Sequence, residues 1–83
     1  MRVEVLLFGP YAEKAGCRAV AMELAAPQDR TAGRVLQLLA QRHPELREML
    51  AAAVLAVNHR AVPPAHPIGQ NDELAVIGLV SGG

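Results

Sequence analysis

The sequence predicts an α+β domain in which one main helix covers a mixed sheet of four to five strands. Two patterns predict this class. Short extended segments lie toward both ends of the chain, and residues 32–42 repeat apolar side chains at helical spacing. At 83 residues the chain is long enough for one small domain and too short for two.

The composition describes a globular domain with an aliphatic core. Hydrophobic residues make up 52% of the chain, yet there is no Trp and only one Phe and one Tyr, so Val, Leu, Ile, Ala and Met must fill the core. Eight basic residues balance eight acidic ones, which argues against wrapping nucleic acid or coating an anionic membrane. Cys17 has no second cysteine to pair with, and no apolar stretch approaches the roughly 20 residues of a membrane-spanning helix. We therefore expect a cytoplasmic domain with no nucleic-acid or membrane partner.

The first half of the chain predicts two strands and the main helix. Residues 2–9 and 19–25 alternate as strands do, and residues 11–16 between them form a helical turn that a glycine closes. Thr31 is placed to cap the helix at 32–42, because its hydroxyl can accept a hydrogen bond from a backbone N–H of the first turn. The side chains expected inside are Val3, Val5, Leu7, Val20, Met22, Leu24, Ala32, Val35, Leu36, Leu39 and Ala40.

The second half predicts a short helix, two short strands and a longer final strand. Residues 45–52 look helical, and residues 54–57 either continue that helix or begin a strand. We favour the strand because the Asn-His pair at 58–59 is typical of a turn, and a second extended piece follows at 60–62. Prolines and a glycine then exclude regular structure until residues 73–80, a strand that is apolar on both faces and therefore central.

The order of these elements narrows the fold class. Two adjacent strands, a covering helix and a last strand that returns to the centre beside the first form the arrangement of a β-grasp, ubiquitin-like sheet. Periodicity alone supports only a helix packed on a sheet. We expect residues 1–83 to form a single β-grasp domain, with residues 81–83 as a flexible C-terminal tail.

The ending "GLVSGG" raises the main functional question, because two glycines stand at its end. They are either an ordinary frayed terminus or a reactive one. Glycine suits a reactive terminus, since no side chain blocks attack on the Gly83 carbonyl and Gly82 can pass through a narrow channel. A carboxylate is a poor electrophile and needs activation, most simply as a mixed anhydride with AMP. The chain has no phosphate-binding glycine loop, so another protein must bind the ATP.

No other residues predict a catalytic centre, a bound cofactor or a metal site. Cys17 lacks a positioned base, and His43, His59 and His66 lack the paired spacing of a zinc site. Phe8, the one phenylalanine, has two interpretations. Either it completes the core, or it stands on the sheet face away from the helix and joins apolar residues of the last strand in a docking patch.

Four segments carry a resemblance to a known family. They are the opening "VEVLLFGPYAEKAG", the helix-capping Thr31, the turn in "LAVNHRAV" and the ending "QNDELAVIGLVSGG", and the likeness covers essentially the whole chain. On these segments the chain resembles the small subunit of molybdopterin synthase, within the ubiquitin-like sulfur carriers. The resemblance implies the β-grasp fold.

The resemblance also implies a mechanism. An E1-like adenylyltransferase uses ATP to adenylate the Gly83 carboxylate, and a sulfur donor enzyme converts it to a thiocarboxylate. The tail then enters the active site of the large subunit of molybdopterin synthase, where sulfur passes to cyclic pyranopterin monophosphate and forms the dithiolene of molybdopterin. Gly83 would carry the sulfur covalently, Gly82 would permit access, and Phe8, Ile77 and Leu79 would dock the partner. The chain would bind no cofactor and have no active site of its own, as the sulfur-donating subunit of a sulfurtransferase.

Departures from the family pattern keep alternatives open. Asn71 replaces a glycine that many members have before the acidic pair, and Ala61 and Ile77 replace bulkier docking residues. A smaller docking side chain suits a different pocket on the partner, so these departures leave more than one partner protein open. One alternative is a related carrier for thiamine thiazole or tRNA thiolation, and the other is a β-grasp interaction or modifier domain without sulfur chemistry. The length of chain between the helix and the last strands favours the molybdopterin branch.

Overall fold

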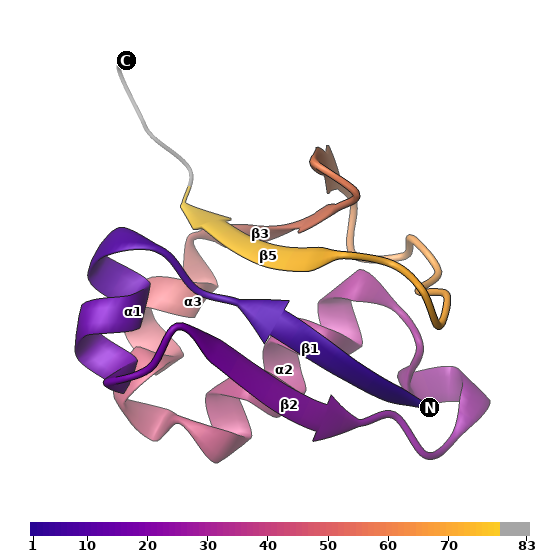
Figure 1. Ribbon diagram of the computed structural model, residues 1–83, viewed down its shortest axis with the longest axis horizontal. Helices are drawn as coiled ribbons and strands as arrows, with labels where there is room; N and C mark the ends of the chain where they lie inside the picture. The colour runs from indigo at the N-terminus through magenta and orange to yellow at the C-terminus, as the bar shows by residue number, and fades with distance from the viewer. Residues whose placement is uncertain (79–83) are drawn as a thin grey trace.

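The structure, a computed structural model, describes residues 1–78 and builds them around a five-stranded sheet (Figure 1). The order of elements matches the predicted one. In chain order the elements are β1 (Arg2–Leu6), α1 (Gly9–Ala15), β2 (Ala19–Glu23), the 3-10 turn η1 (Pro27–Asp29), α2 (Ala32–Arg42), the 3-10 turn η2 (Pro44–Leu46), α3 (Arg47–Ala51), β3 (Ala53–Val57), β4 (Arg60–Val62) and β5 (Leu74–Gly78).

The last strand lies at the centre of the sheet. The strand order is β2-β1-β5-β3-β4, and β5 runs parallel to β1 and antiparallel to β3. Leu74 of β5 stands opposite both Val5 and Val57 and is fully buried. A mixed sheet with a central last strand and a main helix on one face is the β-grasp arrangement, so the predicted fold class is confirmed.

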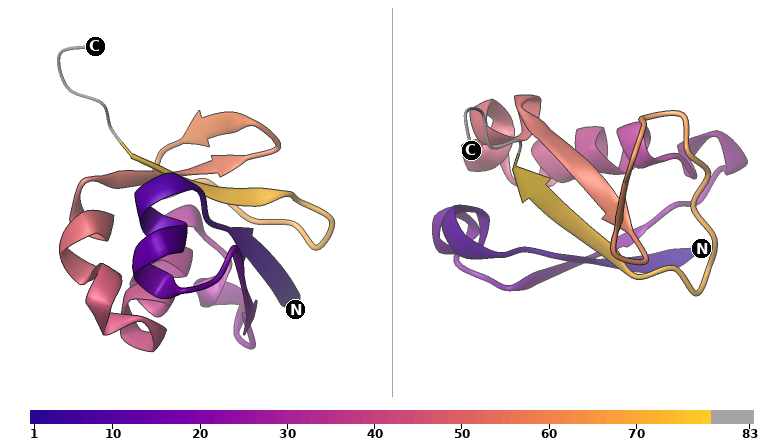
Figure 2. Two further views of the ribbon diagram at one scale, coloured as in Figure 1. Left: turned by 60° about the vertical axis from the view of Figure 1, so that its left-hand side comes forward. Right: turned by 90° about the horizontal axis from the view of Figure 1, so that it is seen from above.

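One face of the sheet packs against α2 and α3, which lie behind the strands in Figure 1 and beside them in Figure 2. Successive strand residues point to opposite faces, and alternate residues of β1, β2 and β5 are accordingly buried. Of the side chains expected inside, Leu36 and Ala40 are half-buried and the others are buried. The largest fully buried side chains are Leu7, Leu24, Leu39, Leu46, Leu55, Leu74, Val5, Val35 and Val76.

The loop that precedes β5 holds the N-terminus of α2. Thr31 caps the helix as predicted, because its Oγ1 accepts a hydrogen bond from a backbone N–H of the first turn at 3.3 Å. The N–H groups of Ala32 and Gly33, which have no partner within the helix, donate to the carbonyl oxygens of His66 and Pro64, each at 2.9 Å. The proline-rich loop is thus fastened to the main helix by backbone hydrogen bonds.

Besides shifts of one or two residues at other element ends, two boundaries differ from the prediction. β1 ends at Leu6 rather than at residue 9, because Gly9 takes a positive φ of 52° and begins α1. Residues 45–52, expected as one helix, are divided between η2 and α3. Leu46 at the end of η2 is fully buried, so the tighter 3-10 turn brings this side chain into the core.

Gly33 gives the first testable prediction. A Cβ at this position would lie 2.9 Å from the Pro64 Cβ and 3.3 Å from the Pro64 carbonyl oxygen. We expect Gly33→Ala to lower the free energy of unfolding by about 1–2 kcal/mol, because overpacking against the loop outweighs the roughly 1 kcal/mol by which alanine favours a helix. Urea denaturation measures the change. Gln41→Ala, at an exposed position of the same helix, is the control and should stay within about 0.5 kcal/mol of wild type. An unchanged or higher stability for Gly33→Ala would mean that the loop moves aside at no cost.

Candidate functional site

The sheet face opposite the helices carries an exposed apolar surface. Strand alternation turns Phe8 and Ile77 away from their buried neighbours Leu7 and Val76. Phe8 is 58% exposed and Ile77 is 37% exposed, and within residues 1–78 no other large hydrophobic side chain is exposed to this extent. The interpretation of Phe8 as a residue that completes the core is therefore wrong.

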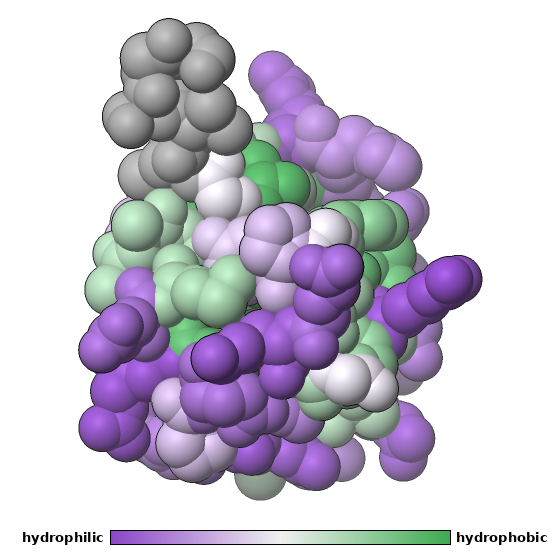
Figure 3. Space-filling view, turned by 90° about the vertical axis from the view of Figure 1, so that its left-hand side faces the viewer, coloured by the Kyte–Doolittle hydropathy of each residue, from purple (hydrophilic) through white to green (hydrophobic). Residues whose placement is uncertain are grey.

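Two hollows lie beside Phe8 and Ile77, and both residues line each of them. The larger, of about 500 Å³, lies between α1, α3 and the end of β5 and is also lined by Gly9, Pro10, Tyr11, Met49, Val76 and Gly78. The smaller, of about 240 Å³, is also lined by Leu6, Ala56, His59, Glu73 and Ala75. Figure 3 looks onto the end of the molecule that carries α1 and shows hydrophobic surface gathered there above a polar lower part. We call Phe8, Ile77 and the larger hollow the apolar patch.

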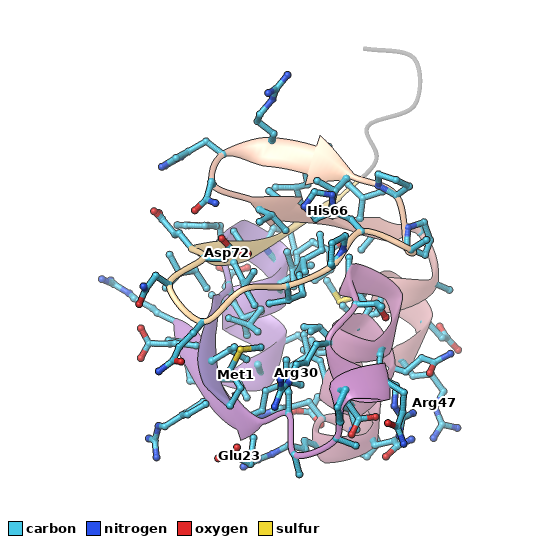
Figure 4. The ribbon with its side chains drawn as sticks, turned by 90° about the vertical axis from the view of Figure 1, so that its right-hand side faces the viewer. Met1, Glu23, Arg30, Arg47, His66 and Asp72 are labelled. Carbon is cyan, nitrogen blue, oxygen red and sulfur yellow. The ribbon has the colours of Figure 1, made fainter. Side chains whose placement is uncertain are left out.

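A polar cluster fixes the start of β5. The Asp72 carboxylate accepts a hydrogen bond from the Gly69 backbone N–H at 2.6 Å and another from Asn58 Nδ2 at 2.9 Å. Asn58 Oδ1 in turn accepts from the Glu73 backbone N–H at 3.0 Å. The hydrogen bond from Gly69 and then that from Asn58 lower the pKa of Asp72 below its usual 3.8, with a smaller contribution from the charge of His66. Figure 4 labels Asp72 and His66, which both belong to the loop between β4 and β5. This cluster ties the loop before β5 to the turn between β3 and β4.

The structure brings together two of the predicted site residues. Phe8 follows β1, Ile77 lies in β5, and the two meet at the apolar patch. Leu79, Gly82 and Gly83, together with the tail predicted at 81–83, lie outside the described residues.

Sequence reasoning missed Tyr11 at this site. The Tyr11 hydroxyl donates to the carbonyl oxygen of Met49 at 3.4 Å, and the Tyr11 side chain lies against Gly78 at the end of β5. One signal marks the place of this contact, although it does not identify Tyr11. A single glycine inside an apolar strand, here Gly78, is typical of a place where another group approaches the backbone closely.

The other candidate residues make ordinary local contacts. Cys17 is half-buried, His43 Nδ1 lies 2.9 Å from a Glu45 carboxylate oxygen, and His59 Nε2 lies 3.2 Å from one of Glu73. Across residues 1–78 no three His, Cys, Asp or Glu side chains form a group that could hold a metal ion. The same residues include no helix with the length and apolar character needed to cross a membrane.

Sequence comparison finds relatives along the whole chain. The sequence model of the ThiS family matches residues 5–83. The molybdopterin synthase sulfur carrier subunit of Mycobacterium tuberculosis is 33% identical over 84 aligned positions, which cover 100% of this chain and 99% of the relative. The protein of the same name from Arabidopsis thaliana is 30% identical, over 100% of this chain and 84% of the relative.

Solved structures share the fold. The small archaeal modifier protein SAMP1 of Haloferax volcanii is 28% identical, with a TM-score of 0.83 and 100% of both chains covered. A chain from the complex of subunits 1 and 2 of the molybdopterin-converting factor of Helicobacter pylori is 24% identical, with a TM-score of 0.66 and 100% of both chains covered. At that identity the second likeness concerns the fold alone.

The neighbours Leu7 and Phe8 give a paired prediction. Leu7 is 1% exposed and Phe8 is 58% exposed, so the two side chains differ mainly in burial. We expect Leu7→Ala to lower the free energy of unfolding by about 2–5 kcal/mol, and Phe8→Ala to lower it by less than about 1 kcal/mol. Urea denaturation of both variants tests this. Equal losses would show that the Phe8 ring is part of the core after all.

Asp72 gives a pH-dependent prediction. Because its folded pKa lies below its unfolded value of 3.8, its contribution to stability is complete above that value and is lost as the pH falls through the lowered pKa. Asp72→Asn keeps one acceptor oxygen and loses the other. We expect it to cost about 0.5–1.5 kcal/mol near pH 7 and less near pH 2. Urea denaturation of both proteins at the two pH values measures the difference, and a pH-independent difference would contradict the prediction.

Proposed function

The chain belongs to the ThiS family, and from this premise we propose that it is the sulfur carrier subunit of a molybdopterin synthase. The observation that carries the proposal is the Gly82-Gly83 ending, which follows a central strand whose last described residue lines the apolar patch. The two sulfur carrier relatives, similar over the whole chain, support the same assignment.

Gly83 is the reacting residue in this proposal. Its carboxylate attacks the α-phosphate of ATP bound to an E1-like adenylyltransferase, and pyrophosphate leaves. Sulfur from a donor enzyme then displaces AMP from the carbonyl carbon, which leaves a C-terminal thiocarboxylate on Gly83. In the large subunit this sulfur passes to cyclic pyranopterin monophosphate, and water cleaves the bond between the sulfur and the Gly83 carbonyl carbon, which restores the carboxylate. Two such transfers form the dithiolene of molybdopterin.

The rest of the chain presents this terminus and binds the partners. Buried Leu74 anchors β5, so the segment that follows Gly78 starts from a fixed point. Phe8 and Ile77, with Leu79 beyond the described residues, dock the partner proteins, the adenylyltransferase as well as the large subunit, because exposed apolar anchors supply most of the affinity at protein interfaces. The chain carries the sulfur and provides the docking surface, while the partners bind the ATP and the pterin. A free Cys17 and a thiocarboxylate both fit a reducing cytoplasm.

A protein modifier is the second candidate function. The likeness to the small archaeal modifier protein of Haloferax volcanii, at a TM-score of 0.83, favours it. A modifier would use the same activation of Gly83 but would transfer the whole chain to an amine of a target protein.

Intact mass tests the carrier role. The chain is incubated with ATP, an E1-like activating enzyme and a sulfur source. We expect a gain equal to one sulfur replacing one oxygen, located in the C-terminal peptide. No gain, with an activating enzyme that works on another carrier, would contradict the proposal. The variant that lacks Gly82 and Gly83 is the control: it should show no gain and keep its unfolding midpoint, because the described sheet ends at Gly78.

The acceptor is tested with the thiocarboxylated chain. Mixed with a large subunit and cyclic pyranopterin monophosphate, it should give molybdopterin. A modifier would instead appear as adducts of the whole chain on lysines of other proteins. A thiocarboxylate that gives neither product would redirect the proposal to thiazole or tRNA thiolation.

A further inference from the structure

Tyr11 connects three elements at the end of β5. The side chain projects from α1, packs against the core and places its hydroxyl 3.4 Å from the Met49 carbonyl oxygen in α3. It lines the larger hollow together with Gly78, the last residue of β5. In Figure 1, α1 and α3 both lie at the end of the sheet toward which the β5 arrow points. The tyrosine therefore stands at the place where the chain leaves the sheet.

Gly78 leaves room for Tyr11 because it has no side chain. The φ of Gly78 is outside the left-handed region, so its backbone conformation does not require glycine. A Cβ at residue 78 would lie 3.0 Å from Tyr11 Oη, but 3.5 and 3.7 Å from the ring carbons Cε2 and Cζ. The first distance is too short for an ordinary contact and the other two are not. Of these three atoms only the hydroxyl oxygen is too close, so a side chain at residue 78 would require it to shift by a few tenths of an ångström.

Gly78 is also the origin of the segment that ends in Gly83. It stands opposite Ala53 at the end of the β3–β5 register, and five residues follow it. Five residues span at most about 17 Å, so the position of Gly78 limits where Gly83 can reach.

We propose that Tyr11 is the positioning residue for the reacting C-terminus, because its side chain packs next to Gly78 and fixes the position of that residue where the chain leaves β5. The inference rests on the proposed function, since it concerns the delivery of Gly83 to an activating enzyme. Its effect falls on the chemical step, because Phe8 and Ile77 stay in place to bind the partner. A misplacement of about 1 Å at a reacting group can reduce a rate by about 100-fold.

The test compares Gly78→Ala, Tyr11→Phe and the double variant with wild type. Adenylation by an E1-like adenylyltransferase is followed as pyrophosphate release. We expect Gly78→Ala to lower kcat by about tenfold with KM within about twofold, because the added methyl displaces the strand end while the exposed side chains of Phe8 and Ile77 are unchanged. Tyr11→Phe keeps the ring and loses the hydrogen bond to Met49, so its kcat should fall by less than that of Gly78→Ala. The double variant should regain kcat to within about threefold, because the nearest contact of the methyl becomes the 3.5 Å one.

Two further variants complete the comparison. Tyr11→Ala removes the ring that packs next to Gly78 and should lower kcat as Gly78→Ala does. Thermal unfolding is measured to confirm that this variant folds. Ile77→Ala is the contrasting variant, and it should raise KM with little change in kcat because it weakens docking.

The outcomes separate this inference from the proposed function. If wild type is not adenylated by an enzyme that works on another carrier, the proposed function fails and the positioning role fails with it. If wild type is adenylated, an unchanged kcat in Gly78→Ala, or a loss that Tyr11→Phe does not restore, overturns the role of Tyr11 alone. Amide hydrogen exchange at Gly78 and Ala53 gives an independent readout: it should be faster in Gly78→Ala and return to the wild-type rate in the double variant. Exchange that is equal in all four proteins would also overturn the role of Tyr11.

Discussion

The parallel pairing of β1 with β5 is the contact on which the rest of this structure depends. It places the last strand between the first and the third, where Leu74 is buried opposite both Val5 and Val57. Parallel neighbours cannot be joined by a tight turn, so the chain between them must travel across the sheet, and α2 covers the core on that path. Without β5 the β1–β2 and β3–β4 pairs would share no strand.

The same pairing places the apolar patch beside the end of β5. Leu6 stands opposite Ala75 across the parallel ladder. Two residues further along each chain, on the same face, come Phe8 and Ile77, so the parallel direction carries both to the end of the sheet where β5 stops. An antiparallel neighbour would have separated them. A docking surface and the exit of the chain are therefore adjacent because of strand direction.

The sequence was informative where local rules decide the outcome. Alternation identified the first two strands and their buried faces, and Thr31 marked the start of α2, because burial and capping act over a few residues. Alternation also assigned Phe8 a side, but it could not tell whether another element covers that side. Ile77 came from resemblance rather than from pattern, and the role of Gly83 stays a prediction. The contacts of Gly33 with Pro64 and of Gly78 with Tyr11 join residues far apart in the chain, so no local signal identifies the partner of either glycine.

The central place of β5 also has a consequence during protein synthesis. β5 leaves the ribosome after the strands on both of its sides, so until residue 78 has emerged the two strand pairs expose unpaired inner edges that readily bind other strands. A chain whose translation stops before residue 74 lacks both the central strand and Ile77. A partner that recognises Phe8 and Ile77 together would then ignore such fragments. Binding to such a partner would then be limited to chains translated past β5, which ends a few residues before the two glycines.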